Sequence, residues 1–315
     1  MKERGIYYPN GEYKSRQEIV DKLARSSEQV IFKTPITKGQ GFEFWHNELT
    51  RRQEAREQAF PRENHVKIEI PTEKPVRLCF IGDVHAGGGK VDYDRFAKDI
   101  AYIRDRPNTY LITLGDLTDS FFFNPAQDEH LASREEQYEY MKAALGEVKE
   151  KLLVGFAGNH ERWKKKVSSS QYRDFEERYN AHYLEGVGWI ELGIGNVVYQ
   201  ITAAHKHTGY SQWNAGHSSR KLAFEEGGGD INVTAHRHQK QINQRTYKEF
   251  GGSSRVVYDI CLGSYKSEDE YSRNLGHAHK SIEEMGGVAV DLSPFQPLVI
   301  PRWDVRDKNN LTKPL

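Results

Sequence analysis

The sequence predicts an α/β fold, preceded by a short and mainly helical segment. Apolar runs of strand length recur from Val76 onward, and the first of them are separated by amphipathic stretches long enough for helices. Strands that are apolar along their whole length are typical of a sheet with both faces covered. The apolar runs near the carboxyl end follow one another directly, and a second sheet packed on the first would use them.

The overall composition is that of a globular, somewhat polar protein. Of the 315 residues, 37% are hydrophobic and 29% are charged, and lysine plus arginine equals aspartate plus glutamate at 45 each. This balance neither favours nor excludes a nucleic-acid partner, so only local clusters of charge are informative. No apolar run reaches the length of a membrane span, and the first residues do not resemble a signal peptide. We therefore expect a cytoplasmic protein without a membrane partner.

The two cysteines, Cys79 and Cys261, each lie in an apolar run. We interpret both as small buried side chains. Two cysteines are too few for a disulfide scaffold or for a zinc site built on cysteine, which agrees with a reducing compartment.

The segment 1–70 differs from the remainder and is predicted to form a helical arm. Residues 14–32 contain apolar side chains at helical spacing behind a capping box of Ser15 and Glu18, and then a second short helix after a tight turn. Residues 48–60 are a third helical stretch, which is mostly polar. Two short helices joined by a turn are compatible with a DNA-binding helix-turn-helix, and also with an arm for packing or oligomerisation.

A stretch bracketed by prolines, residues 61–75, joins this arm to the main domain, residues 71–315, and could add a strand at residues 66–70. The strands expected beyond it cover residues 76–82, 109–115, 151–158, 197–204 and 231–235, followed by strands within 256–266, 286–292 and 297–305. Helices are expected over residues 92–105 and 133–150. The first places Phe96, Ile100 and Ile103 on one face, and Ser133 with Glu136 can cap the second.

Polar clusters follow five of the predicted strands. They are Asp83-Val84-His85, Asp116-Leu117-Thr118-Asp119, Asn159-His160-Glu161, His205-Lys206-His207 and His236-Arg237-His238. Because ligand groups in open α/β sheets gather at the carboxyl ends of strands, we expect the clusters to converge on one edge. Aspartate and imidazole together suit Mn, Fe or Zn better than Ca or Mg.

The number of candidate metal ligands exceeds what one ion needs. The candidates are Asp83, His85, Asp116, Asn159, His205, His236 and His238. Two ions about 3.5–4 Å apart that share a bridging carboxylate would use them all. Each cluster alone has an ordinary alternative, such as a turn, a helix cap or surface histidines, but their joint occurrence after apolar runs favours a metal centre.

The same series resembles the calcineurin-like metallophosphoesterase superfamily over residues 76–292. The resemblance implies a β-sandwich of two mixed sheets flanked by helices, in the order α/β/β/α. Two positions depart from the family pattern, since Ala235 stands where glycine is usual and Lys206 follows His205. His205 or His207 could therefore be the fourth-motif ligand. We favour His205, with His207 as a substrate contact or a surface residue.

The resemblance also implies the role of each ligand. Asp83, His85, Asp116 and His238 would hold one metal ion, and Asp116, Asn159, His205 and His236 would hold the second. The two ions would polarise phosphoryl oxygens and lower the pKa of a bridging water, so that hydroxide is available near neutral pH. His160 would act as general acid, and Asp119 would orient it. Mn is favoured, with Fe and Zn as alternatives.

Several further side chains are candidates for substrate binding. Arg162 and Lys164 follow the third cluster directly, where they could bind phosphate or belong to a solvated helix start. Glu161 is interpreted as an offset for these cations. Lys266 is a further cationic candidate at the rim of the site, and Tyr210 could stack on a base or pack against the core.

These features predict a phosphodiesterase that depends on two metal ions and acts on DNA or RNA, that is, a nuclease. A phosphomonoesterase or nucleotide hydrolase with a small substrate would use the same metal core, and a non-catalytic nucleic-acid-binding module is a third reading. Residues 263–292 also resemble phage-encoded members of the superfamily, which would place the protein in a host cytoplasm.

Overall fold

The computed structural model describes residues 6–7, 13–14, 41–59, 64–120, 130–161, 178–209, 211, 214–248, 251–268, 273 and 281–307. The chain divides into two compact units, Met1–Glu63 and Asn64–Leu315. The strand predicted at residues 66–70 is present as β3 (His65–Ile70), and it pairs with β8 of the larger unit. This pairing places residues 64–70 in the main domain, whereas the sequence predicts a boundary after residue 70.

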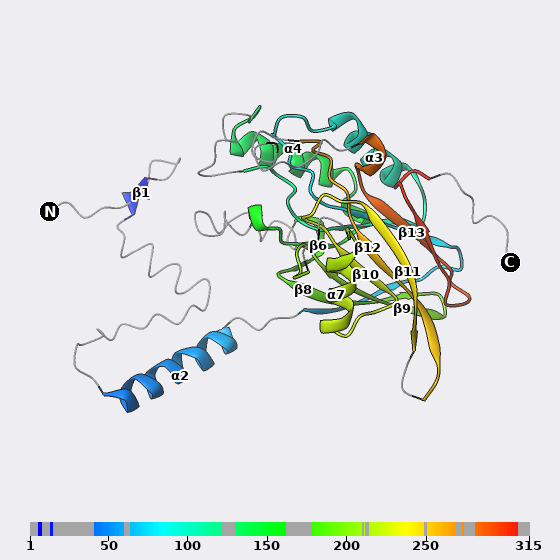
Figure 1. Ribbon diagram of the computed structural model, residues 1–315. Coiled ribbons are helices and arrows are strands. Elements are labelled where there is room, and N and C mark those ends of the chain that lie inside the picture. The colour runs from blue at the N-terminus through cyan, green and yellow to red at the C-terminus, as the bar shows by residue number, and fades with distance from the viewer. Residues whose placement is uncertain are drawn as a thin grey trace. The chain divides into compact units, whose positions relative to one another are not determined.

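In the first unit, the structure describes a short antiparallel pair and one helix (Figure 1). The pair consists of β1 (Ile6–Tyr7) and β2 (Tyr13–Lys14), and the helix is α2 (Phe42–Ala59). Helix α2 contains the third predicted helical stretch. Its Glu48 forms ion pairs with Arg51 and Arg52 at 3.0 and 2.8 Å, the spacing at which helical side chains meet. The predicted helix pair over residues 14–32 lies, apart from Lys14, outside the described residues.

The second unit contains two mixed sheets of six strands each. Sheet 1 has the order β14 (Val299–Arg302), β13 (Val288–Leu292), β4 (Val76–Ile81), β5 (Thr109–Thr113), β6 (Leu152–Phe156) and β7 (His182–Leu184). Sheet 2 has the order β11 (Gln241–Lys248), β12 (Ser254–Cys261), β10 (Ile231–Thr234), β9 (Val197–Ala204), β8 (Val187–Ile194) and β3. Strands β4 to β7 are parallel to one another, and so are β9, β10 and β12, which sends several carboxyl ends to a common edge.

Helices cover the outer face of each sheet. Helices α3 (Tyr93–Asp105) and α4 (Arg134–Gly146) pack on sheet 1, where Phe96, Ile100 and Ile103 are buried as the sequence predicts. The capping box predicted at the start of α4 is present, with both of its reciprocal hydrogen bonds. Helix α7 (His217–Glu225) packs on β10 and β12 of sheet 2. Two single turns, η2 (Lys149–Lys151) and η3 (Ile282–Glu284), are 3₁₀-helical.

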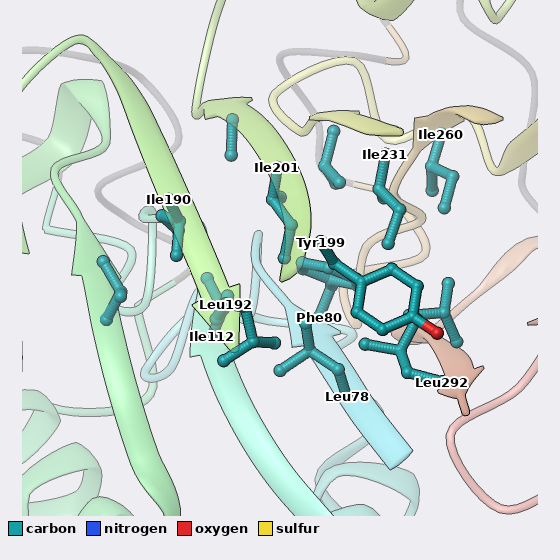
Figure 2. Close-up of a cluster of buried hydrophobic side chains, with 14 of the residues drawn as sticks. Leu78, Phe80, Ile112, Ile190, Leu192, Tyr199, Ile201, Ile231, Ile260 and Leu292 are labelled. Atoms are coloured by element: carbon teal, nitrogen blue, oxygen red, sulfur yellow. The ribbon is translucent and has the colours of Figure 1, made fainter. Parts of the chain in front are cut away.

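The main hydrophobic core lies between the two sheets. Figure 2 shows side chains of both sheets meeting there, among them Leu78, Phe80, Ile112, Ile190, Leu192, Tyr199, Ile201, Ile231, Ile260 and Leu292. Alternate residues of β4 point to opposite faces, so Leu78 contributes to this core while Cys79 packs under the helices. The predicted α/β/β/α sandwich is therefore confirmed.

Both cysteines are buried and unpaired, as interpreted from the sequence. In the described part of the chain, no helix combines the length and the apolar character needed to cross a bilayer.

Candidate metal centre

The predicted polar clusters meet at the carboxyl ends of strands from both sheets. Those after β4, β5 and β6 come from sheet 1, and those after β9 and β10 come from sheet 2. Within them, the ligand atoms of Asp83, His85 and His238 lie within 4.8 Å of one another, as do those of Asp116, His205 and His236. Segments more than 150 residues apart in the sequence thus contribute to a single site.

The backbone at this edge adopts an unusual conformation. Asp83, His85, Asp116, His236 and His238 all have positive φ, between 50° and 70°. Side chains other than glycine rarely occupy this region, and such strain gathers at functional sites, where surrounding contacts hold it in place. The turns after β4, β5 and β10 therefore orient these side chains at an energetic cost.

The first group is formed by Asp83, His85 and His238. The Nε2 atoms of the two histidines are 3.1 Å apart, and Asp83 Oδ1 lies 3.3 Å from His238 Nε2 and 3.8 Å from His85 Nε2. Asp83 Oδ1 is buried and accepts no hydrogen bond in the described structure, whereas Oδ2 accepts one from the His236 backbone N–H at 2.7 Å. A buried carboxylate oxygen without a donor, facing two imidazole nitrogens, is suited to a cation.

The second group is formed by Asp116, Asn159, His205 and His236. His205 Nδ1 donates to the carbonyl of Leu114 at 2.6 Å, so in the neutral ring Nε2 carries the lone pair. That Nε2 lies 3.1 Å from Asp116 Oδ2 and 3.0 Å from Asn159 Oδ1, and His236 Nδ1 lies 4.0 Å from Asp116 Oδ2. Several acceptor atoms converge here, an arrangement that a proton or a metal ion stabilises.

Electrostatic coupling in the two groups is strong. Burial alone would lower the pKa of His205, but the carboxylates of Asp116 and Asp83 raise it to about 9. Burial would likewise raise the pKa of Asp83, yet the imidazoles of His238 and His205 hold it below its usual range. The carboxylates thus stay ionised and draw positive charge. This donor set, two buried carboxylates, imidazole nitrogens and an amide oxygen, fits divalent metal ions.

His160 lies beside both groups. It is 3% exposed, its ring packs edge-on against that of His85, and its Nδ1 contacts the backbone carbonyl of Asp119. The other ring nitrogen, Nε2, lies 3.9 Å from Asp116 Oδ2. Because a carbonyl only accepts, Nδ1 is the donor, and Nε2 is the atom that exchanges a proton with the site.

A family model for calcineurin-like phosphoesterases matches residues 76–263. The chain belongs to this family. Its members are metal-dependent hydrolases of phosphoesters, so the family agrees with the groups of possible metal ligands just described. A comparison with curated proteins gives no match.

Solved structures resemble the chain at low sequence identity. The chain is similar to Vps29 from Chaetomium thermophilum, at 13% identity over 69% of this chain and 80% of that one, with a TM-score of 0.37. It is also similar to a putative 5'-nucleotidase from Staphylococcus aureus, at 13% identity over 76% and 56% of the two chains, with a TM-score of 0.39. Nuclease MPE from Pseudomonas putida gives 13% identity over 71% and 86%, with a TM-score of 0.29.

The two departures from the family pattern have structural explanations. The chain bends at His205, so His207 leaves the site and its Nε2 lies 3.6 Å from Glu225 Oε2 and 3.7 Å from Glu226 Oε1. His205, and not His207, therefore lies among the grouped side chains. Ala235 is tolerated before the last His-x-His because its methyl group faces Gly82, where a Cβ would lie 3.3 Å away.

Asp119 is placed differently from the family-based expectation. The sequence predicts that its carboxylate orients His160, but it is its backbone carbonyl that accepts a hydrogen bond from that ring, while a carboxylate oxygen lies within 4.8 Å of a ring nitrogen. The carboxylate instead contacts His85 Nδ1 at 2.9 Å, Lys266 Nζ at 3.0 Å and His130 Nε2 at 3.2 Å. A fully buried carboxylate requires cationic partners, and the buried ammonium group of Lys266 is one of them.

Three side chains contribute to the site in ways that the sequence did not predict. Lys266 is 3% exposed and so is not at the rim, and His130 joins it on Asp119. Glu161 does not simply offset cations, because its carboxylate accepts hydrogen bonds from the backbone N–H groups of Asp116, Leu117 and Gly158 at 2.8–2.9 Å. The only sequence signal for Glu161 was its position next to His160.

The remaining predicted substrate contacts, Arg162, Lys164 and Tyr210, lie outside the described residues.

Proposed function

We propose that the protein hydrolyses phosphodiester bonds of nucleic acid with two divalent metal ions bound at the strand ends. The supporting observation is that the two groups of potential ligands adjoin one another, since Asp83 of the first group accepts a hydrogen bond from the backbone N–H of His236 of the second at 2.7 Å. Nucleic acid as substrate is supported by the cationic residues that follow the third motif, Arg162 and Lys164.

In this proposal, Asp83, His85 and His238 would hold the first ion, Asn159, His205 and His236 would hold the second, and Asp116 would be a ligand shared by both. Mn is the proposed metal, because mixed carboxylate and imidazole ligands suit it. When bound, the ions would supply Lewis acidity toward the phosphoryl group and lower the pKa of a water molecule.

Groups next to these ligands would fix the orientation of the ligand side chains. Asp119 accepts from His85 Nδ1, which directs the lone pair of His85 Nε2 toward the first group. The Leu114 carbonyl does the same for His205. Asp119 is thus a support for a ligand, since its own carboxylate is already paired with Lys266.

His160 is proposed as the general acid. Its Nδ1–H is held by the Asp119 carbonyl, and its Nε2 lies on the side of Asp116. From that position Nε2 would donate its proton to the leaving oxygen of the substrate.

Hydrolysis of bis(p-nitrophenyl) phosphate and of p-nitrophenyl phosphate, each with added Mn, tests the reaction class. We expect the diester to be the better substrate. Single- and double-stranded DNA are then tested as cleavage targets. Efficient monoester hydrolysis with inert DNA and RNA would favour a phosphomonoesterase or nucleotide hydrolase instead. The cytoplasmic location, the phage-type origin and the DNA-binding arm stay predictions.

A further inference from the structure

Arginine and aromatic side chains alternate on the outer face of sheet 2. Arg220 and Phe224 come from α7, Arg245 and Tyr247 from β11, and Arg255 from β12. We call these five residues the Arg–aromatic surface. Phe224 has the guanidinium carbons of Arg220 and Arg245 at 5.9 and 5.2 Å from its ring centroid. Tyr247 has those of Arg245 and Arg255 at 6.0 and 5.6 Å, within the range of cation–π attraction.

The strand register places this surface on the same side as α7. Tyr247 is opposite Arg255 in the antiparallel pair, and directly opposed residues share a face. Farther along the same pair, Gln241 is opposite Cys261, whose sulfur contacts Ser219 of α7. The hairpin of β11 and β12 extends past the start of β10, as Figure 1 shows, because β10 begins opposite Tyr258.

The surface lies away from the metal centre. Strand β11 begins at Gln241, shortly after His238, and runs to Tyr247. At about 3.4 Å per residue, this part of the strand spans about 20 Å. The Arg–aromatic surface is therefore separate from the groups that would hold metal.

The rings are exposed while ion pairs fix the arginines around them. Phe224 is 63% exposed and Tyr247 is 40% exposed. Arg245 is held by Asp259 at 2.6 Å, and Arg255 by Asp230 at 3.2 Å. Within the described residues, Arg220 forms no ion pair, so none of their carboxylates is paired with its positive charge.

A cavity of about 280 Å³ adjoins the surface. Arg255 donates to Gln200 Oε1 at 3.4 Å and to the Gly228 carbonyl at 2.8 Å, and Gln200 also lines the cavity. The lining also includes Trp189 and Thr202. Since water takes about 30 Å³ per molecule, the cavity has the volume of about nine waters, which is enough for one planar base.

We propose that the Arg–aromatic surface binds single-stranded nucleic acid, with bases stacked on Phe224 and Tyr247 and with the guanidinium groups contacting phosphates and bases. The inference rests on the proposed function, for which it supplies substrate contacts remote from the metal centre. Stacking on aromatic rings tolerates any base sequence, because every base has a π face. Two guanidinium carbons lie within about 6 Å of each ring centroid, which favours an anionic, aromatic ligand over an apolar protein face.

Fluorescence anisotropy with labelled 20-nucleotide oligo-dT and oligo-rU tests this inference on the full chain, in EDTA so that no cleavage occurs. Phe224→Ala and Tyr247→Ala should each weaken binding at least about fivefold, and the double variant more. Arg220→Gln should reduce the slope of log affinity against log salt by about one. Phe295→Ala is the matched control, because Phe295 is 67% exposed in the turn between β13 and β14. This variant should bind the oligonucleotides as the wild type does.

Both rings are exposed, so their removal should leave the thermal stability unchanged, and melting curves check this. Unchanged affinity in the double variant overturns the inference. The inference is also overturned if the double variant differs from the wild type only in its oligomeric state, measured by light scattering. That result would show that the surface is a protein interface. Hydrolysis of bis(p-nitrophenyl) phosphate separates the two proposals. Ring-dependent binding without metal-dependent hydrolysis supports the inference and refutes the proposed function, whereas hydrolysis without ring-dependent binding overturns the inference alone.

Discussion

Glu161 connects the two loops that meet at Asp116, and its removal should destabilise the main domain. Its Oε2 accepts from the backbone N–H groups of Asp116 at 2.8 Å and Gly158 at 2.9 Å, and its Oε1 accepts from Leu117 at 2.8 Å. The loops touch so closely that a Cβ at Gly115 would lie 2.3 Å from the Gly158 nitrogen. Little space therefore remains for water to replace the carboxylate.

The size of the effect follows from these three hydrogen bonds. A buried donor left without its partner costs about 1–3 kcal/mol, and Glu161 is partly exposed, so we take about 1 kcal/mol for each bond. Glu161→Ala should then lower the free energy of unfolding by about 3 kcal/mol. For a domain of this size that corresponds to a melting temperature about 6–12 °C lower. Glu161→Gln keeps one acceptor oxygen and should lose about half as much.

Thermal melting in EDTA is the appropriate measurement, because bound metal would add its own stabilisation. Glu147→Ala is the control, since Glu147 makes an ion pair with Arg104 at 2.9 Å in which both side chains are about half exposed. Such a pair contributes less than about 1 kcal/mol. A Glu161→Ala protein that melts within about 2 °C of the wild type would show that the three hydrogen bonds do not hold the loops.

Three further predictions concern the site and its surroundings. His160→Asn should lower turnover about 10²–10⁴-fold and leave the metal content unchanged. Asn159→Ala and His236→Ala should instead lose metal, as measured by elemental analysis. An unchanged turnover in His160→Asn would contradict the acid role. Lys266→Met should lower the free energy of unfolding in urea by about 3–5 kcal/mol, because it leaves the buried Asp119 carboxylate without its ammonium partner, and Lys266→Arg should lose less. Burial lowers the pKa of Lys240 to about 8, so the unfolded chain binds more protons than the native one between about pH 8 and 10.4. The free energy of unfolding should rise with pH across that window by up to about 3 kcal/mol more in the wild type than in Lys240→Met. Urea unfolding of both proteins at pH 7.5 and 10.5 measures this. An equal change in the two proteins between these pH values would refute the prediction.

The sequence was sufficient for the features that depend on local patterns. The apolar runs predicted the strands that end at the site, and the capping box predicted the start of α4. Asp83 and His85 could be recognised because a strand, a turn and a ligand pair are adjacent in the chain. The choice of His205 over His207 also followed from a local feature, the end of β9 at Ala204.

Contacts between distant segments could not be predicted in the same way. Nothing near residue 65 shows that β3 pairs with β8, more than 100 residues later, and this pairing moves the start of the main domain to Asn64. The Arg–aromatic surface likewise depends on α7 lying against β12, which brings Phe224 beside Arg245. Each of these residues alone reads as an ordinary surface side chain.

Asp119 shows how such a distant contact changes a functional assignment. From its motif, Asp119 belongs with His160, 41 residues away, and the chain does bring the two together through the Asp119 carbonyl. The carboxylate, however, is fully buried and must be neutralised, and Lys266, 147 residues away, supplies the charge. The same carboxylate then fixes the orientation of His85. Asp119 therefore acts on His85, a candidate metal ligand, through its side chain, and on His160, the proposed acid, through its backbone. A single residue thereby couples the orientation of His85 to that of His160, and a change at Lys266 should disturb both.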